Sequence, residues 1–297
     1  MTAPLIVPMP GNETLARNLC ALGAGEFREL DTRAFPDGET YLRFPQAPSG
    51  RSVALIATLA DPNEKFLPLL FAARTARELG ARRVGLVAPY LSYMRQDARF
   101  HPGEAVTSRH FASLISADFD WLVTVDPHLH RYRALGEIYT IPARSLHAAP
   151  LLAAWIEAHA AKPFLIGPDV ESEQWVSQVA KDANAPYIVL EKVRKGDTEV
   201  NVTVPQVEKY KDHTPVLVDD IISTARTMIE TVNHLKKAGM KPPVCIGVHA
   251  VFAGHAYQEL QNAGVDSIIT CNTIAHASNA LDVTALMAAS VNKIFLS

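Results

Sequence analysis

Short apolar runs alternate with amphipathic stretches along this chain. The apolar runs lie at residues 5–7, 53–57, 83–88, 121–125, 164–167, 187–190, 216–218 and 244–248. Between them, apolar residues recur at helical spacing over 12–21, 64–79, 108–116, 148–160, 173–183, 229–239 and 283–294. Apolar runs bounded by turn residues are typical of buried strands. The alternation of strands and helices predicts an α/β protein.

Two strand–helix–strand segments in this pattern have the same length. In the first, strand 53–57 leads to a helix that ends at Gly80 and then to strand 83–88. In the second, the strand at 216 leads to a helix that ends at Gly239 and then to strand 244–248. Glycine just past the last turn is a typical helix ending. The correspondence predicts a tandem duplication, with residues 1–143 and 144–282 as the two domains.

The strand that begins at Val216 ends in a polar segment. Asp219 and Asp220 stand at its carboxyl end, and small and hydroxyl residues from Ser223 to Thr227 open the next helix. Backbone N–H groups and the helix dipole at such a turn bind phosphate. The two carboxylates are suited to sugar hydroxyls or to a metal-bound group. The alternative is an ordinary capped helix, because Ser, Thr and Asp are common caps.

A second polar loop follows strand 83–88. Arg95, Arg99 and His101 lie within seven residues, in a loop bounded by proline and glycine. Cationic side chains beyond the carboxyl end of a strand suit a polyphosphate ligand. A solvated charged loop is the alternative.

Strand 121–125 runs into a third polar segment. If extended geometry persists beyond Val125, alternation places Asp126, His128 and His130 on one side. That set could bind a metal-bound phosphate. Pro127 can break the alternation, and histidines at such positions often only form hydrogen bonds.

Two further segments have simple structural explanations as well as functional ones. Lys192 and Arg194 alternate near the end of a strand over 187–194, as charged residues on solvated sheet edges also do. The sequence around Asp37-Gly38 marks a tight turn between two strands. On its own this turn is a hairpin tip with solvated acidic residues.

The amino-acid composition and the net charge indicate which kinds of binding partner and which cellular compartment to expect. The chain of 297 residues is 48% hydrophobic and 20% charged, which is typical of a soluble globular protein. Its net charge of −3 and pI of about 6.4 give no reason to expect nucleic acid or an anionic membrane as partner. The three cysteines are widely spaced, so we expect reduced thiols and a cytoplasmic setting. The opening residues lack a basic flank before their apolar residues, and no long apolar stretch follows, so we expect neither a signal peptide nor a membrane span.

The ordered set of segments resembles the ribose-phosphate pyrophosphokinase (phosphoribosyl pyrophosphate synthetase) family over nearly the whole chain. The string from Val216 to Thr227 is similar to the phosphoribosyl-pyrophosphate loop, which type I phosphoribosyltransferases share. The resemblance implies an α/β fold of two tandem type I phosphoribosyltransferase-like domains, each with a mostly parallel sheet flanked by helices, and with the helix in 283–297 packed on the first. It also implies transfer of the β,γ-diphosphoryl group of Mg-ATP to the C1 hydroxyl of ribose 5-phosphate.

The resemblance also implies a role for each segment. It assigns catalysis to Lys192 and Arg194, and ATP binding to Phe35, Asp37, Gly38, Glu39, Arg95, Gln96 and Arg99. It assigns contact with the metal to Asp126, His128 and Asp169, and ribose 5-phosphate binding to Arg194, Asp219, Asp220, Ser223, Thr224, Ala225, Arg226 and Thr227. The implied cofactor is Mg²⁺. Because the family's adenine-binding hairpin serves ATP of a neighbouring subunit, the resemblance implies a homo-oligomer, at least a dimer.

Two departures from the family pattern stand out. Arg226 occupies a position where the family usually has glycine, which predicts either a turn without positive φ there or an added charge for the phosphate. The segment from Arg131 to Arg133 replaces the Gln-Gly-Phe-Phe signature of bacterial and mammalian members. This replacement indicates the archaeal-like branch.

Two other functions are compatible with the same residues. One is a catalytically silent homologue that regulates a synthetase. Arg226 leaves this function open, and the presence of Lys192, Arg194, His128 and both acids argues against it. The other is a phosphoribosyltransferase, which the ATP-type hairpin and the doubled domain disfavour.

Overall fold

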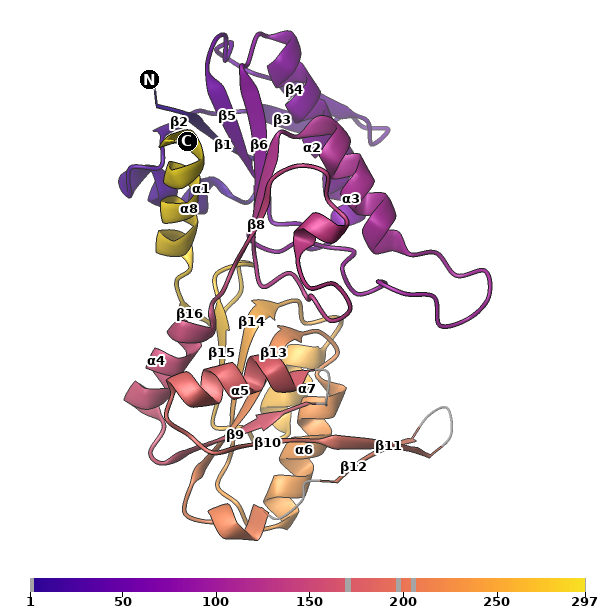
Figure 1. The fold of residues 1–297 in the computed structure, drawn as a ribbon, viewed down its shortest axis with the longest axis vertical. Coiled ribbons are helices and arrows are strands. Elements are labelled where there is room, and N and C mark those ends of the chain that lie inside the picture. The colour runs from indigo at the N-terminus through magenta and orange to yellow at the C-terminus, as the bar shows by residue number, and fades with distance from the viewer. Residues whose placement is uncertain (1–2, 169–171, 196–198, 204–206, 297) are drawn as a thin grey trace. The chain divides into compact units, whose positions relative to one another are not determined.

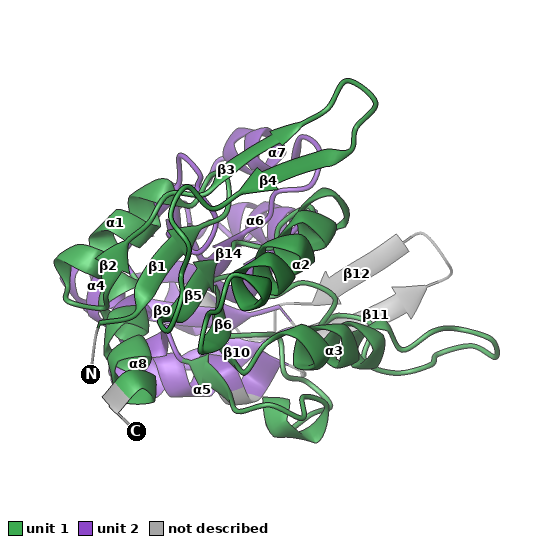
Figure 2. Cartoon of the chain, turned by 90° about the horizontal axis from the view of Figure 1, so that it is seen from above, with its two compact units in different colours: residues 1–146, 283–297 green, residues 147–282 purple. Residues whose placement is uncertain are grey.

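The computed structural model describes residues 3–168, 172–195, 199–203 and 207–296 (Figure 1). The chain divides into two compact units, coloured separately in Figure 2. Unit 1 comprises Met1–Leu146 and Val283–Ser297, and unit 2 comprises His147–Asp282.

Unit 1 is built on a parallel six-stranded sheet of order β2-β1-β5-β6-β7-β8. The strands are β1 Leu5–Pro8, β2 Glu26–Phe27, β5 Ser52–Ile56, β6 Arg83–Ala88, β7 Trp121–Val125 and β8 Ala143–Leu146. The helices are α1 Glu13–Ala21, α2 Pro62–Glu78, α3 Thr107–Asp118, the 3-10 turn Leu135–Glu137 and α8 Thr284–Leu296. A separate antiparallel hairpin consists of β3 Asp31–Ala34 and β4 Thr40–Arg43. Figure 1 shows α1 with α8 on one side of the sheet and α2 with α3 on the other.

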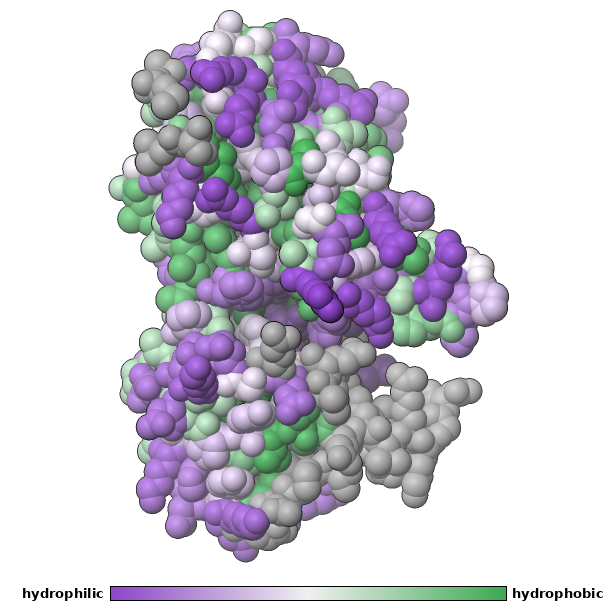
Figure 3. Space-filling model, viewed as in Figure 1, coloured by the Kyte–Doolittle hydropathy of each residue, from purple (hydrophilic) through white to green (hydrophobic). Residues whose placement is uncertain are grey.

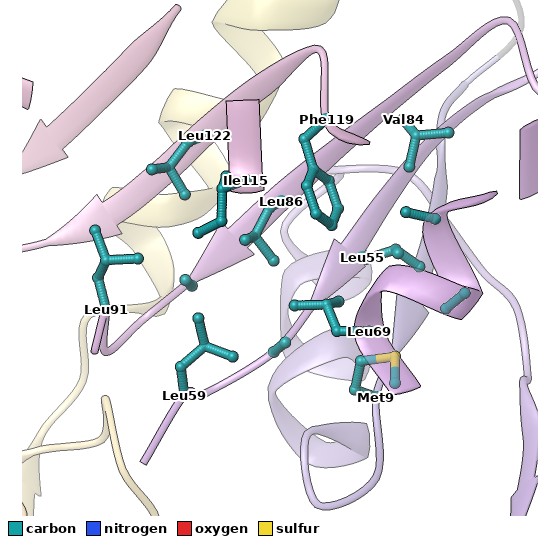
Figure 4. Close-up of a cluster of buried hydrophobic side chains, with 14 of the residues drawn as sticks. Met9, Leu55, Leu59, Leu69, Val84, Leu86, Leu91, Ile115, Phe119 and Leu122 are labelled. Atoms are coloured by element: carbon teal, nitrogen blue, oxygen red, sulfur yellow. The ribbon is translucent and has the colours of Figure 1, made fainter. Parts of the chain in front are cut away.

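The core of unit 1 lies between its sheet and its helices. Figure 4 shows part of it: Met9, Leu55, Leu59, Leu69, Val84, Leu86, Leu91, Ile115, Phe119 and Leu122. The central strands are continuous apolar runs because a parallel sheet with helices on both faces buries both sides of each strand. This packing positions the carboxyl ends of β6 and β7, where two of the candidate loops begin.

The last helix, α8, is fixed to the sheet by an aromatic pair. A Cβ on Gly85 would lie 1.8 Å from the Trp121 ring, so only glycine allows the indole to lie across β6. Phe295 then meets Trp121 edge to face, with ring centroids 5.5 Å apart. Helix α8 is thereby part of unit 1 and packs on its sheet.

Unit 2 repeats the architecture of unit 1. Its parallel sheet has the order β10-β9-β13-β14-β15-β16, which is the strand order of unit 1 counted from each unit's own first strand. The strands are β9 Pro163–Gly167, β10 Tyr187–Val189, β13 Thr214–Ile222, β14 Val244–Ala250, β15 Ser267–Cys271 and β16 Asn279–Leu281. The helices are α4 Ala149–His159, α5 Glu173–Asp182, the 3-10 turn Val207–Tyr210, α6 Arg226–Lys237 and α7 Ala256–Asn262. The predicted α/β class with two mostly parallel sheets is confirmed.

The single strand predicted over 187–194 was wrong. The N–H of Leu190 donates to the carbonyl of Gly167 and ends the pairing of β10 with β9. The chain then forms a second strand, β11 Glu191–Lys195, which pairs antiparallel with β12 Glu199–Thr203. The buried side chain of Leu190 separates the two strands, so the sheet ends where the charged residues begin.

The outer surface agrees with the composition. Hydrophilic residues cover much of the face of unit 1 that Figure 3 shows. Within the described ranges, the structure contains no helix with the length and apolar character needed to cross a membrane.

Candidate active site

The acidic pair lies inside the last part of β13. Asp219 and Asp220 are half-buried, whereas the adjacent residues Val218 and Ile221 are buried in the sheet. The N–H of Asp220 donates to Oδ1 of Asp219 over 2.9 Å. Asp219 stands opposite Gly247 of β14, so the two carboxylates occur at the carboxyl end of a central strand, where α/β proteins bind ligands.

The turn from β13 to α6 has a left-handed residue at its last position. Ala225 has φ 55° and immediately precedes the first helical residue, Arg226. The turn is tied to the loop after β14, because Phe252 N–H donates to the carbonyl of Ile222 and Ala253 N–H to that of Ser223. These two hydrogen bonds fix the loop that leads into α6. The backbone N–H groups of the first turn of α6 are therefore held in position, as an anion-binding site requires.

Arg226 does not take the strained position of this turn. Positive φ occurs one residue earlier, at Ala225, and Arg226 is an exposed residue at the start of α6. Thr224 is exposed as well, and Ser223 and Thr227 are half-buried. Apart from Arg194 in β11, the residues predicted to bind ribose 5-phosphate thus lie in one continuous strand–turn–helix segment of unit 2.

The predicted catalytic residues lie in the β11–β12 ribbon. Lys192 pairs with Val202 and Arg194 with Val200. Asp169, the third predicted metal residue, lies outside the described residues.

The β3–β4 hairpin presents the predicted adenine-binding residues. Phe35 N–H donates to the carbonyl of Glu39 over 2.7 Å, and Gly38 N–H donates to that of Phe35 over 2.9 Å. Oδ1 of Asp37 accepts the N–H of Glu39, so part of this carboxylate stabilises the turn. Gly38 has φ 90°, which glycine adopts without strain. The Phe35 ring is 37% exposed and open to a planar ligand.

Arg33 belongs to this hairpin site although the sequence analysis did not single it out. Its guanidinium carbon lies 4.7 Å from the ring centroid of Phe35 and 4.5 Å from that of Tyr41. The two rings meet edge to face at 6.2 Å. Arg33 stands opposite Tyr41 in the strand pairing, and a cation over two rings orients Phe35. The spacing of Arg33 two residues before Phe35, next to a hairpin turn, is the feature of the sequence that could have indicated this contact.

The predicted polyphosphate loop follows β6. Arg95 and Arg99 are exposed and Gln96 is half-buried. Nε of Arg99 donates to the carbonyl of Glu104 over 2.9 Å. Oε2 of Glu104 accepts the N–H groups of Phe100 and His101, and these hydrogen bonds lower the pKa of the Glu104 carboxyl. The Glu104 carboxylate therefore stabilises the conformation of the loop to which it belongs.

The segment after β7 departs from the predicted alternation. Asp126 has φ 34° and His128 φ 48°, so extended geometry does not persist beyond Val125. The backbone instead turns twice through the left-handed region, which non-glycine residues occupy mainly at functional sites. Asp126 N–H remains bonded to the carbonyl of Leu146, at the end of β8.

These turns still bring the two histidines together. Nε2 of His130 lies 3.1 Å from Nδ1 of His128, and the ring centroids are 3.9 Å apart. One imidazole N–H lies between the two nitrogens. This hydrogen bond fixes the orientation of the His128 ring.

The ligand chemistry fits a magnesium ion that a nucleotide supplies. Mg²⁺ prefers oxygen ligands and usually keeps water or phosphate in its shell. Unit 1 offers the Asp126 carboxylate beside His128, and unit 2 offers the carboxylates of Asp219 and Asp220. Among the residues that the structure describes, these oxygen atoms are too few in either unit for a dedicated cage, but enough to contact a metal–polyphosphate complex.

Comparisons with known proteins match both halves of the chain to one family. Residues 5–118 match the N-terminal domain of ribose phosphate pyrophosphokinase, and residues 134–285 match the phosphoribosyl transferase domain. A ribose-phosphate pyrophosphokinase of Methanosarcina acetivorans is 32% identical over 97% of this chain and 99% of that protein. The ribose-phosphate pyrophosphokinase of Sulfolobus acidocaldarius is 31% identical over 90% of this chain and 91% of that protein.

A solved structure gives the same result for the fold. The phosphoribosylpyrophosphate synthetase of Mycobacterium smegmatis superposes with a TM-score of 0.86, covers 99% of both chains and is 23% identical. The two sequence relatives are archaeal, as the segment 131–133 indicated. On the two matched domains and the full-length similarity, this chain belongs to the ribose-phosphate pyrophosphokinase family.

Proposed function

We propose that the chain is a ribose-phosphate diphosphokinase, which converts ATP and ribose 5-phosphate to phosphoribosyl pyrophosphate and AMP. One observation carries the proposal. In unit 2, two half-buried carboxylates stand at the end of β13, directly before an anchored turn and the N-terminus of α6. That combination suits a sugar hydroxyl pair and a phosphate on the same small molecule.

The reaction moves a diphosphoryl group. The C1 hydroxyl oxygen of the sugar attacks the β-phosphorus of ATP, the bond from the β-phosphorus to the bridging α,β-oxygen breaks, and AMP leaves. The sugar hydroxyl loses its proton in the process. Negative charge spreads over the transferred group, so the protein contributes mainly positioning and electrostatic stabilisation. We assign Lys192 and Arg194 to that stabilisation.

The sugar phosphate is assigned to unit 2. The first N–H groups of α6 and the side chains from Ser223 to Thr227 bind the 5-phosphate. Asp219 and Asp220 accept hydrogen bonds from the ribose hydroxyls. Because the turn is anchored through the carbonyls of Ile222 and Ser223, it needs little rearrangement when the sugar binds.

The nucleotide is assigned to the polar segments of unit 1. Phe35 stacks on the base, and Asp37, Gly38 and Glu39 contact its edge. Arg95, Gln96 and Arg99 bind the phosphates. Asp126 and His128 would hold the Mg²⁺ of the nucleotide, which neutralises phosphate charge when bound. Asp169, which the resemblance also assigns to the metal, belongs to unit 2 and lies outside the described residues.

The test is to incubate the purified chain with Mg-ATP and ribose 5-phosphate and to follow both products by mass spectrometry. AMP and phosphoribosyl pyrophosphate should form in equal amounts, and omission of ribose 5-phosphate should prevent AMP formation. No AMP from a folded chain that binds both substrates would support a silent regulatory homologue. Pyrophosphate release from phosphoribosyl pyrophosphate and a free base would support a phosphoribosyltransferase.

We also infer a homo-oligomer of at least two chains. The hairpin exposes Phe35 on the surface of its own unit, which suits a base bound partly by another chain. Light scattering of the purified protein tests the inference, and a mass of one chain at micromolar concentration would refute it.

A further inference from the structure

The two loops that follow β6 and β7 are joined by an ion pair whose carboxylate is buried. Nη1 of Arg131 lies 2.8 Å from Oδ1 of Asp97. The Asp97 side chain is 2% exposed and that of Arg131 is 41% exposed. A carboxylate so deeply buried needs a charged partner, so the arginine determines where residue 97 sits.

The next residue, Tyr132, makes a second connection. Its hydroxyl donates to the backbone carbonyl of Asp97 over 3.2 Å. Ser108 Oγ lies 3.2 Å from the same hydroxyl, and Nε of Arg109 donates to it over 3.3 Å. Both Tyr132 and Ser108 are buried. The segment after β7 is thus attached to the loop and also to the first turn of α3.

A third contact lies at the outer part of the loop. The guanidinium carbon of Arg131 stands 5.0 Å from the ring centroid of Phe100. That ring is 61% exposed, and a cation over it restricts its motion. Arg131 therefore holds the loop at two positions, Asp97 and Phe100.

The held positions lie among the proposed phosphate ligands. Arg95 and Gln96 directly precede Asp97, and Arg99 directly precedes Phe100. On the other loop, His128 lies three residues before Arg131. The ion pair thus connects the cationic loop to the histidine turn, and both loops belong to unit 1.

We propose that Arg131 is a positioning residue for the nucleotide, with Tyr132 in support: it sets the loop 95–104 against the turn 126–130 before ATP binds. Pre-set ligands raise affinity because binding need not order them. The proposal rests on the proposed function only in taking Mg-ATP as the ligand. The proposal assigns a role to Arg131 and Tyr132, which lie in the segment that replaces the Gln-Gly-Phe-Phe signature of other family members.

The variants are Arg131→Gln, Arg131→Lys and the control Arg133→Gln. Arg133 is an exposed arginine of the same segment, and within the described ranges its guanidinium makes no ion pair. Hydrogen exchange of the loop amides 95–104 in the free protein measures the attachment. Calorimetric titration with Mg-ATP measures its consequence for affinity, independently of turnover.

Arg131→Gln should raise loop exchange and weaken Mg-ATP binding about tenfold, with the Michaelis constant for ribose 5-phosphate changed less than about twofold. Arg131→Lys should restore part of the affinity, since it keeps the charge, and it serves as the test if Arg131→Gln fails to fold. Arg133→Gln should match the wild type. Unchanged exchange, or faster exchange with unchanged Mg-ATP affinity, overturns the proposal.

The double variant Asp97→Asn with Arg131→Gln separates positioning from direct contact. If Arg131 acts through Asp97, the double variant should bind Mg-ATP no more weakly than the worse single variant. Additive losses would mean that Arg131 contacts the nucleotide itself and would overturn the proposal. A wild type that binds Mg-ATP but forms no AMP would refute the proposed function and leave this test intact.

Discussion

Asp61 and Ala225 occupy the same position in the two units, and both are left-handed. Each directly precedes the helix that follows the third strand in its sheet order, with φ 53° at Asp61 and 55° at Ala225. The turn geometry is thus common to both copies of the fold. The adjacent acidic pair occurs only before Ala225, whereas the corresponding turn of unit 1 reads Thr58-Leu-Ala-Asp61. The two turns therefore differ in their side chains rather than in the backbone.

The first prediction concerns the backbone of that turn. Ala225→Val should lower the free energy of unfolding by about 1–3 kcal/mol, because β-branched residues fit the left-handed region poorly. Ala225→Gly should change it by less than about 1 kcal/mol, since relief of φ strain is offset by chain entropy. Urea denaturation measures both. Ala263→Val, at a helix end with φ −65°, is the control, and an equal loss there would remove φ as the cause.

The second prediction concerns Arg226, an exposed cation at the start of α6. A cation is unfavourable beside the positive end of the helix dipole unless an anion binds there. Arg226→Gly should raise the Michaelis constant for ribose 5-phosphate about tenfold, through loss of a charge-assisted bond of about 1.5–3 kcal/mol. The constant for ATP should change little.

Arg226→Ala removes the guanidinium without adding glycine flexibility and should behave like Arg226→Gly. Steady-state titration of both substrates decides the matter. A constant for ribose 5-phosphate equal to that of the wild type in both variants would show that Arg226 makes no contact with the phosphate.

The third prediction concerns Lys192. Lys192→Ala should lower turnover by two to three decades, about 3–4 kcal/mol, because its charge is needed mainly as the diphosphoryl group transfers. Binding of ribose 5-phosphate, measured by calorimetry, should stay close to wild type. Lys237→Ala, at an exposed position in the last turn of α6, is the control. Near-normal turnover of Lys192→Ala would exclude this lysine from the mechanism.

The fourth prediction tests whether the hairpin serves another chain. Glu39→Ala and Lys192→Ala should each be weakly active, and mixed oligomers of the two should exceed both parents, because some composite sites then contain neither substitution. Activity is measured after the chains are dissociated and reassembled together. If mixed oligomers form without any recovery, the hairpin acts within its own chain.

The fifth prediction concerns acid and the loop 95–104. Hydrogen bonds from Phe100 and His101 lower the pKa of Glu104 from its ordinary value of 4.5. The stabilisation is therefore present above pH 4.5 and is lost as the pH falls through the lowered pKa. Amide exchange at Phe100 and His101, corrected for intrinsic rates, should rise in that window. Glu104→Gln should show fast exchange without this pH dependence, and a persistent pH dependence would point to another group.

Sequence patterns predicted most elements because buried parallel strands and amphipathic helices depend on local composition. β6 and β7 occur at the residues predicted. The left-handed turns at Asp126 and His128 were not predictable, since positive φ at non-glycine residues depends on the surrounding structure. The pair Asp97–Arg131 joins residues 34 positions apart, and one sequence contains no signal for such a contact. The catalytic roles of the Lys192 and Arg194 side chains remain predictions.

The packing of α8 on unit 1 has a consequence for synthesis on the ribosome. Chains usually fold domain by domain from the N-terminus, but the Trp121 ring receives its Phe295 neighbour only after unit 2 has been translated. Unit 2 is contiguous and can close first. The nascent N-terminal half would meanwhile expose the apolar face that α8 later covers, so it is the part of the chain for which chaperone binding during translation is expected.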